Sequence, residues 1–147
     1  MAGNNKQLHH RVAAVCYRRT PAGPEFLLVR TWDGEWTFPK GMVDPGMTDT
    51  QAAELEAWEE GGVRGEIAPQ PFTDYIHAAK KSAAAQVRVV AFLFEVLKSE
   101  PPPEIHRKPR WFAPRAAKRA LAEGRGNKRA QQFERVIDLA IQEITAL

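Results

Sequence analysis

Several features that mark other classes of protein are missing from this sequence. Cys16 is the single cysteine among 147 residues, which excludes an internal disulfide, and its apolar neighbours favour a packing role. No apolar run is long enough to cross a bilayer, and the polar first ten residues do not resemble a secretory signal. The four histidines have no metal-ligand spacing. We therefore expect a cytoplasmic protein without a membrane segment, in which residues 1–10 form a flexible terminus.

The excess of positive over negative charge is also small. The net charge of +3 favours anionic partners, but no basic stripe with interleaved aromatic side chains is present, so a nucleic-acid partner is not expected. The hydrophobic content of 44% indicates a globular chain, and the length suits one domain, which we place at residues 11–147. The sequence leaves open whether this domain is a monomer or a homodimer.

Three glutamates near the middle of the chain are the most informative feature that is present. Glu56, Glu59 and Glu60 are spaced three and four residues apart, which puts their carboxylates on one face of a helix. Because like charges at this spacing repel, we expect a cation between them, and carboxylate oxygens are ligands that Mg²⁺ prefers. The alternative is a solvated acidic face near a helix end.

The segment before the glutamates predicts how this helix begins. Residues 38–46 have the proline and glycine content of a tight loop rather than of a strand or helix. Thr48 and Gln51 then form a capping-box pattern, in which the hydroxyl caps the backbone of the first turn. The helix is expected to stop at Gly61 and Gly62, where a left-handed cap costs least.

This loop, capped helix and acidic cluster together resemble the signature box of the Nudix hydrolases, which here spans residues 41–63. The family pattern is Gly, five residues, Glu, seven residues, and then Arg-Glu-apolar-x-Glu-Glu-x-Gly-apolar. The positions that match it in register are Gly41, Glu56, Ala57, Glu59, Glu60, Gly62 and Val63.

Two positions depart from the pattern together. Met47 stands where the family has its first Glu, and Leu55 stands where it has Arg. In the family these two residues are expected to pair by charge and to tie the loop to the helix. We interpret the change as one coupled replacement of an ion pair by an apolar contact, which leaves neither partner charged and alone.

The resemblance implies hydrolysis of a phosphoanhydride bond in a nucleoside diphosphate linked to another group, or in a polyphosphate, with Mg²⁺ as cofactor and Mn²⁺ as a possible substitute. By position in the motif, Glu56 and Glu60 would be metal ligands together with the carbonyl of Gly41. Glu59 would be the catalytic general base. The alternative is a catalytically weak Nudix domain that binds a phosphorylated ligand as a sensor or regulatory module, and the departures at Met47 and Leu55 keep it open.

Three short segments, residues 36–41, 56–65 and 107–112, are similar to the diphosphoinositol polyphosphate phosphohydrolase branch, which also acts on diadenosine polyphosphates. A small-molecule polyphosphate needs cations around the metal, because its negative charge must be neutralised. The resemblance suggests as substrate-binding residues Arg11, Arg30, Lys40, Lys80, Lys81, Arg107 and Lys128. The alternative for each is ordinary surface charge. Trp32 and Trp36 are candidates for stacking a base instead.

The order of elements favours an α/β (α+β) fold, and the resemblance implies the Nudix α/β/α sandwich with a mixed β-sheet between helices. A long apolar run at 86–97 is the best candidate for a central buried strand. A helix at 114–122 and a long amphipathic helix with apolar residues from Ala130 to Ile144 follow. The other expected strands are 12–18, 26–30, 36–38, 66–72, 75–79 and 110–112.

Overall fold

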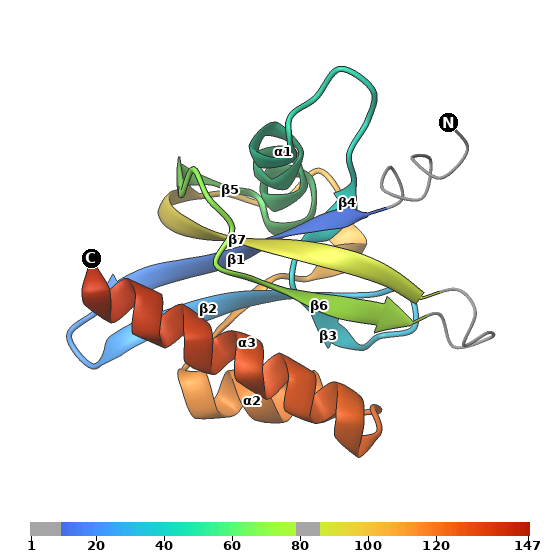
Figure 1. Cartoon of the computed structure of the whole chain (residues 1–147). Coiled ribbons are helices and arrows are strands. Elements are labelled where there is room, and N and C mark those ends of the chain that lie inside the picture. The colour runs from blue at the N-terminus through green and yellow to red at the C-terminus, as the bar shows by residue number, and fades with distance from the viewer. Residues whose placement is uncertain (1–9, 79–85) are drawn as a thin grey trace.

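The computed structural model describes residues 10–78 and 86–147, and they form a mixed sheet between helices (Figure 1). The expected fold class is confirmed. The strands are β1 (Arg11–Thr20), β2 (Gly23–Arg30), β3 (Trp36–Thr37), β4 (Lys40–Met42), β5 (Val63–Ile67), β6 (Thr73–Ala78), β7 (Gln86–Ser99) and β8 (Arg110–Phe112). The helices are α1 (Asp49–Gly61), α2 (Pro114–Ala122) and α3 (Asn127–Ala146), with a 3-10 turn, η3, at Ile105–Arg107.

The sheet is built around two long neighbouring strands. The strand order is β3-β2-β1-β7-β5, with β4 paired to β1, β6 paired to β7 and β8 paired to β2. β1 and β7 run parallel, and the other pairs are antiparallel. Residues 89–94 of β7 are all buried, which is the pattern of a strand covered on both faces. The predicted central strand is therefore confirmed.

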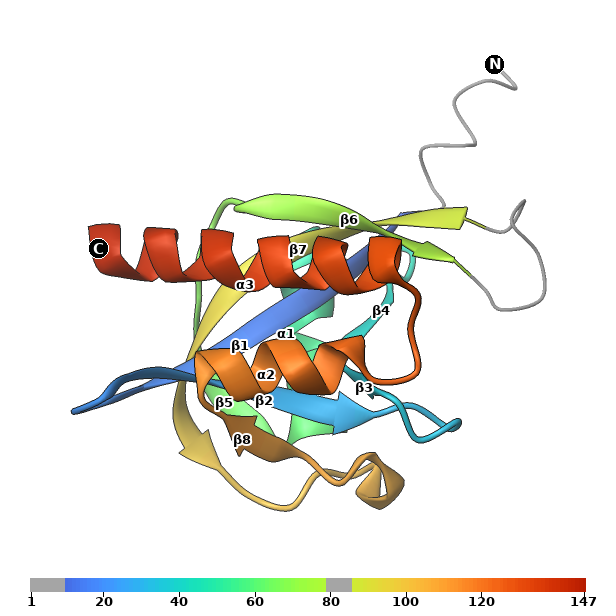
Figure 2. The same cartoon turned by 90° about the horizontal axis from the view of Figure 1, so that it is seen from below.

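Each face of the sheet carries its own apolar cluster. On one face α2 and α3 cover alternate residues of the strands, including Val15 and Leu28. On the other face α1 covers the intervening residues, such as Val12 and Leu27. Figure 2 shows α2 and α3 lying across the sheet, and Figure 1 shows α1 on its opposite side. This alternation follows from the two-residue period of a strand. Cys16 lies fully buried among the α1-side residues, as expected.

The ends of α1 are those that the sequence predicts. The Thr48 side chain accepts a hydrogen bond from the backbone N–H of Gln51, and the Gln51 side chain accepts one from the N–H of Thr48. At the other end Gly62 is left-handed, with φ 66°, and donates its N–H to the carbonyl of Trp58. These two caps fix where α1 begins and ends, and therefore where its acidic side chains lie relative to the sheet.

Two expected segments differ from the structure by more than their end residues, whereas strands such as β2 and β6 only begin a few residues earlier than expected. Residues 40–42 were expected within a tight loop, but they form β4, because the backbone on either side of Gly41 pairs with the start of β1. β5 covers Val63–Ile67 rather than 66–72, because the chain turns straight from the Gly62 cap into pairing with β7. Tertiary pairing outweighs local composition in both segments.

Some residues named in the predictions lie outside the ranges that the structure describes. Lys80 and Lys81 belong to this group, as do residues 1–9 of the expected flexible terminus. His10 is described, and its Nε2 lies 3.1 Å from both carboxylate oxygens of Asp49 at the start of α1. None of the helices in the described ranges is long and apolar enough to cross a membrane.

Candidate active site

Two glutamates on consecutive turns of α1 form an acidic pair. Glu60 is 4% exposed, Glu56 is half-buried, and the two carboxyl groups are close enough for the charge of Glu60 to act on Glu56. Burial, and then the charge of Glu60, raise the pKa of Glu56 to about 8. Burial also raises the pKa of Glu60, although the charge of Arg107 opposes that rise. Two carboxylates in such a place need either a shared proton or a cation.

Strand β4 packs directly against this pair. A β-carbon at Gly41 would overlap the Glu56 carboxylate, so the absence of a side chain at this position lets the carboxylate lie against the backbone. The backbone N–H of Lys40 donates to Oε1 of Glu60 at 3.3 Å. Both carboxylates are thus fixed by the short strand that the sequence predicted to be a loop.

Arg107, from η3, closes the acidic pair on its other side. Its Nη2 lies 3.3 Å from Oε2 of Glu60, and the two side chains are only 16% and 6% exposed. Its Nε donates to Oε1 of Glu104 at 2.9 Å, and its Nη1 donates to the carbonyl oxygen of Arg30 at 3.2 Å. One guanidinium therefore bridges two carboxylates, which is the kind of multiple contact that arginine makes well.

The side chains around the pair fit a divalent cation by their chemistry. No group of three or more His, Cys, Asp or Glu suited to hold a metal occurs within residues 10–78 and 86–147. Two further carboxylates, those of Glu59 and Glu104, are near enough for their charges to raise the pKa of Glu56. Burial and mutual repulsion of these oxygens are relieved by a hard cation.

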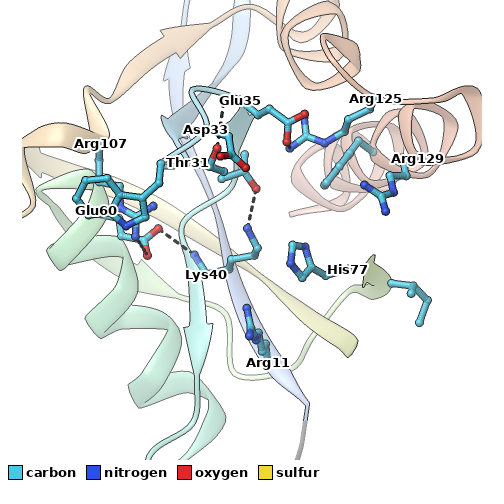
Figure 3. Close-up of a pocket in the computed structure, with 14 residues that line it drawn as sticks. Arg11, Thr31, Asp33, Glu35, Lys40, Glu60, His77, Arg107, Arg125 and Arg129 are labelled. Carbon is cyan, nitrogen blue, oxygen red and sulfur yellow. Dashed lines mark hydrogen bonds and ion pairs between the residues drawn. The ribbon is translucent and has the colours of Figure 1, made fainter. Parts of the chain in front are cut away.

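A cavity of about 520 Å³ opens beside Glu60. Figure 3 shows Glu60 and Arg107 at one end of it, Lys40 in the middle, and Arg125 and Arg129 at the far end. Lys40 Nζ donates to the hydroxyl of Thr37 at 3.1 Å. Burial is the largest cause that lowers the pKa of Lys40 to about 8, and three arginines add to it. Asp33 and Glu35 line the cavity as well as Glu60, but five cations outnumber these three carboxylates, so the cavity is cationic on balance.

The structure brings some of the predicted site residues together and leaves others apart. Arg11, Lys40, Glu60 and Arg107 all line the cavity. None of the remaining predicted residues that the structure describes lines it. Gly41 and Glu56 lie against each other, and the guanidinium of Arg30 lies 3.8 Å from the Trp36 ring centroid. Lys128 lines a neighbouring hollow at residues 124–129, and Glu59 influences Glu56 through its charge.

Four residues of this region were not predicted from the sequence. Arg125 and Arg129 come from the segment between α2 and α3 and from the first turns of α3, and His77 comes from β6. Glu104 follows the triple proline after β7. The basic residues at 125–129 indicate an anion-binding segment, but only Lys128 was predicted to bind the substrate. His77 and Glu104 have no motif around them.

The two tryptophans near the box have different environments. Trp36 is 5% exposed and packs against Phe112 with ring centroids 5.0 Å apart, so it belongs to the core. Trp32 is 79% exposed, lines the cavity, and stacks on His106 with ring centroids 3.8 Å apart and planes at 12°. Only Trp32 of these two offers a ring face to a ligand.

The chain belongs to the Nudix family. The family model described as NUDIX domain matches residues 9–134, a range that contains the whole box. This match confirms the family resemblance that the glutamates and glycines of the box predict.

Individual relatives match in sequence or in fold. The asymmetrical bis(5'-nucleosyl)-tetraphosphatase of Rattus norvegicus is 51% identical over 41 residues, which cover 26% of this chain and 28% of that relative's length. The structure of a C. elegans Ap4A hydrolase binary complex has a TM-score of 0.71 at 20% identity, covering 94% of this chain and 98% of that chain. Shewanella oneidensis NrtR complexed with a 27mer DNA has a TM-score of 0.65 at 15% identity, covering 93% and 62%. At these identities the solved structures show the common fold.

Proposed function

We propose that this chain is a divalent-metal-dependent pyrophosphohydrolase that cleaves a phosphoanhydride bond in a dinucleoside polyphosphate. The proposal rests on one observation: Glu56 and Glu60 lie together on α1, and Glu60 lines a cavity whose other charged side chains are mostly cationic. A hydrolase of phosphoanhydrides needs oxygen ligands for a metal beside cations for the substrate. Membership of the Nudix family agrees with this combination.

Each residue of the box has a proposed role. Glu56 and Glu60 would hold Mg²⁺, or Mn²⁺ in its place, with the carbonyl of Gly41 as a further ligand. The bound ion would neutralise phosphate charge and lower the pKa of a coordinated water. Glu59 is the proposed general base, and Lys40 is placed in the cavity to contact a phosphate oxygen.

Trp32 supports a nucleotide as the substrate. Because its ring is exposed at the cavity and is already held by stacking on His106, a base can stack on it at low entropic cost. The rat relative named above is, by its name, an asymmetrical bis(5'-nucleosyl)-tetraphosphatase. A diphosphoinositol polyphosphate has no base, so it would leave the face of Trp32 opposite His106 uncovered.

A role as a sensor or regulatory binding module is the second candidate, and the position of Arg107 favours it. The guanidinium occupies one oxygen of Glu60, which a metal would also need. A protein that only binds a phosphorylated ligand has no need to release that contact.

Chromatographic separation of the products formed from diadenosine tetraphosphate, ADP-ribose and a diphosphoinositol polyphosphate, with and without Mg²⁺, would test the proposal. Wild type is compared with Glu59→Gln and with Glu54→Gln, an exposed glutamate of the same helix. We expect Mg²⁺-dependent turnover of the dinucleotide that falls at least about 100-fold in Glu59→Gln and stays within about twofold in Glu54→Gln. Ligand binding without turnover on any substrate would support the sensor instead.

A further inference from the structure

The cations of the cavity are not all neutralised. Arg107 pairs with Glu60, and Arg125 has a looser contact, 3.9 Å, with Glu35. For Arg11 and Arg129 no ion pair exists with any carboxylate of residues 10–78 and 86–147. A partly enclosed space with unneutralised guanidinium groups favours an anion.

Several cations of the cavity act on the imidazole of His77. Its pKa is lowered to about 4, first by burial and then by the charges of Lys40, Arg11, Arg129 and Arg125. These four residues come from β4, β1, α3 and the segment before α3, so separate parts of the fold direct positive charge at one point. The same point lies against apolar side chains, Ile76 and Phe133, which weaken the screening of charge by water.

This positive region is separate from the acidic pair. In Figure 3 Arg129 and His77 lie on the side of the cavity opposite Glu60 and Arg107, with Lys40 between them. Glu60 accepts a hydrogen bond from the backbone N–H of Lys40 and pairs with the guanidinium of Arg107, whereas Arg11 and Arg129 are not among its partners. One phosphate at the acidic pair therefore leaves the far cations without a partner, and a longer phosphate chain is needed to satisfy both ends.

We propose that Arg11 and Arg129 form a second phosphate subsite, which selects substrates carrying phosphates beyond the anhydride bond that is cleaved. Lys40 lies between the subsite and the acidic pair, where it can contact the intervening phosphate. The identity of the substrate rests on the proposed function, but binding of phosphate groups to these cations does not. Arg129 takes the role that the sequence assigned to its neighbour Lys128.

Binding of inorganic tripolyphosphate to the full chain, measured by calorimetry in excess chelator, tests the subsite without metal or turnover. The variants are Arg129→Ala, Arg129→Lys, and Lys128→Ala as the matched control, since Lys128 is the adjacent cation and does not line the cavity. We expect Kd to rise at least about tenfold in Arg129→Ala, to recover partly in Arg129→Lys, and to change less than about twofold in Lys128→Ala. Thermal melting checks that each variant is folded.

Three results would overturn the subsite. They are wild-type affinity in Arg129→Ala, an equal loss of affinity in Lys128→Ala, which would indicate diffuse charge attraction, and absence of binding by folded wild type. These results are independent of the proposed function. A chain that binds tripolyphosphate through Arg129 but hydrolyses no dinucleotide retains the subsite and loses the activity, and the reverse outcome retains the activity alone.

Discussion

Removal of the Arg107 guanidinium should destabilise the fold through Glu60. In Arg107→Ala the Glu60 carboxylate, with its side chain 6% exposed, loses its cation and must remain charged or take up a proton. Removing one partner of a buried pair costs roughly 3–5 kcal/mol if the other stays charged. Protonating a carboxyl with an ordinary pKa of 4.5 at pH 7 costs about 3.4 kcal/mol, at about 1.36 kcal/mol per pKa unit, which caps the loss. We therefore expect a loss of about 2–3 kcal/mol at pH 7.

The loss of stability in Arg107→Ala should depend on pH. Burial already raises the pKa of Glu60, and loss of the Arg107 charge raises it further above its value in the unfolded chain. The folded state of the variant therefore takes up the proton first, and the penalty shrinks as pH falls. At pH 5 the protonation cost is about 0.7 kcal/mol, so the loss should fall below about 1 kcal/mol. Urea unfolding followed by tryptophan fluorescence, in chelator at pH 7 and pH 5, measures both values.

Two further variants decide whether the buried pair is the cause. Glu60→Gln removes the charge, so adding Arg107→Ala to it should cost at least about 1 kcal/mol less than Arg107→Ala costs alone at pH 7. Arg110→Ala removes an exposed arginine nearby and should stay within about 0.5 kcal/mol of wild type. A loss in Arg107→Ala that is the same at both pH values, or that Glu60→Gln does not reduce, would refute the reasoning.

Three other outcomes are expected from the structure. His77 is held neutral with its pKa lowered to about 4, first by burial and then by four cations, so the unfolded chain protonates first as pH falls. Stability should drop by about 1–2 kcal/mol between about pH 6.5 and 4, discounted for partial exposure, and unfolding of His77→Gln should lack that drop. Gly62→Ala should cost at least about 2 kcal/mol, because φ is 66° and a β-carbon would overlap a backbone carbonyl; Gly126→Ala, with open space, should cost less than about 1 kcal/mol. Leu55→Arg should lower the melting temperature, and adding Met47→Glu should restore part of it, whereas a harmless single change would contradict the coupled-replacement interpretation.

The parts of the fold that could be predicted are those whose cause is local in the chain. The caps of α1 depend on Thr48, Gln51 and Gly62, which lie within or next to the helix. The central strand β7 is visible as an unbroken apolar run. β4 could not be predicted, because its pairing partner is residues 11–13 of β1 and nothing in residues 40–42 indicates that contact.

The candidate site divides in the same way. The acidic pair follows from helical spacing and from the box, but its burial and its contact with Arg107 depend on η3, far along the chain. The far end of the cavity gathers Arg129 and His77 from elements that the sequence gives no reason to bring together. Lys128 was suggested by the resemblance to the phosphohydrolase branch. The position of its neighbour Arg129 in the cavity depends on which side of α3 faces the sheet, which the apolar stripe of that helix does not specify near its first turn.

Manganese binding is the most direct test of whether the acidic pair holds a divalent cation. Both the proposed activity and the roles proposed for the residues of the box depend on that cation. Free Mn²⁺ can be followed by electron paramagnetic resonance while wild type, Glu56→Gln and the exposed control Glu54→Gln are titrated. We expect saturable Mn²⁺ binding in wild type and Glu54→Gln, and at least about tenfold weaker binding in Glu56→Gln. Equal binding by all three proteins, or none by folded wild type, would contradict this expectation.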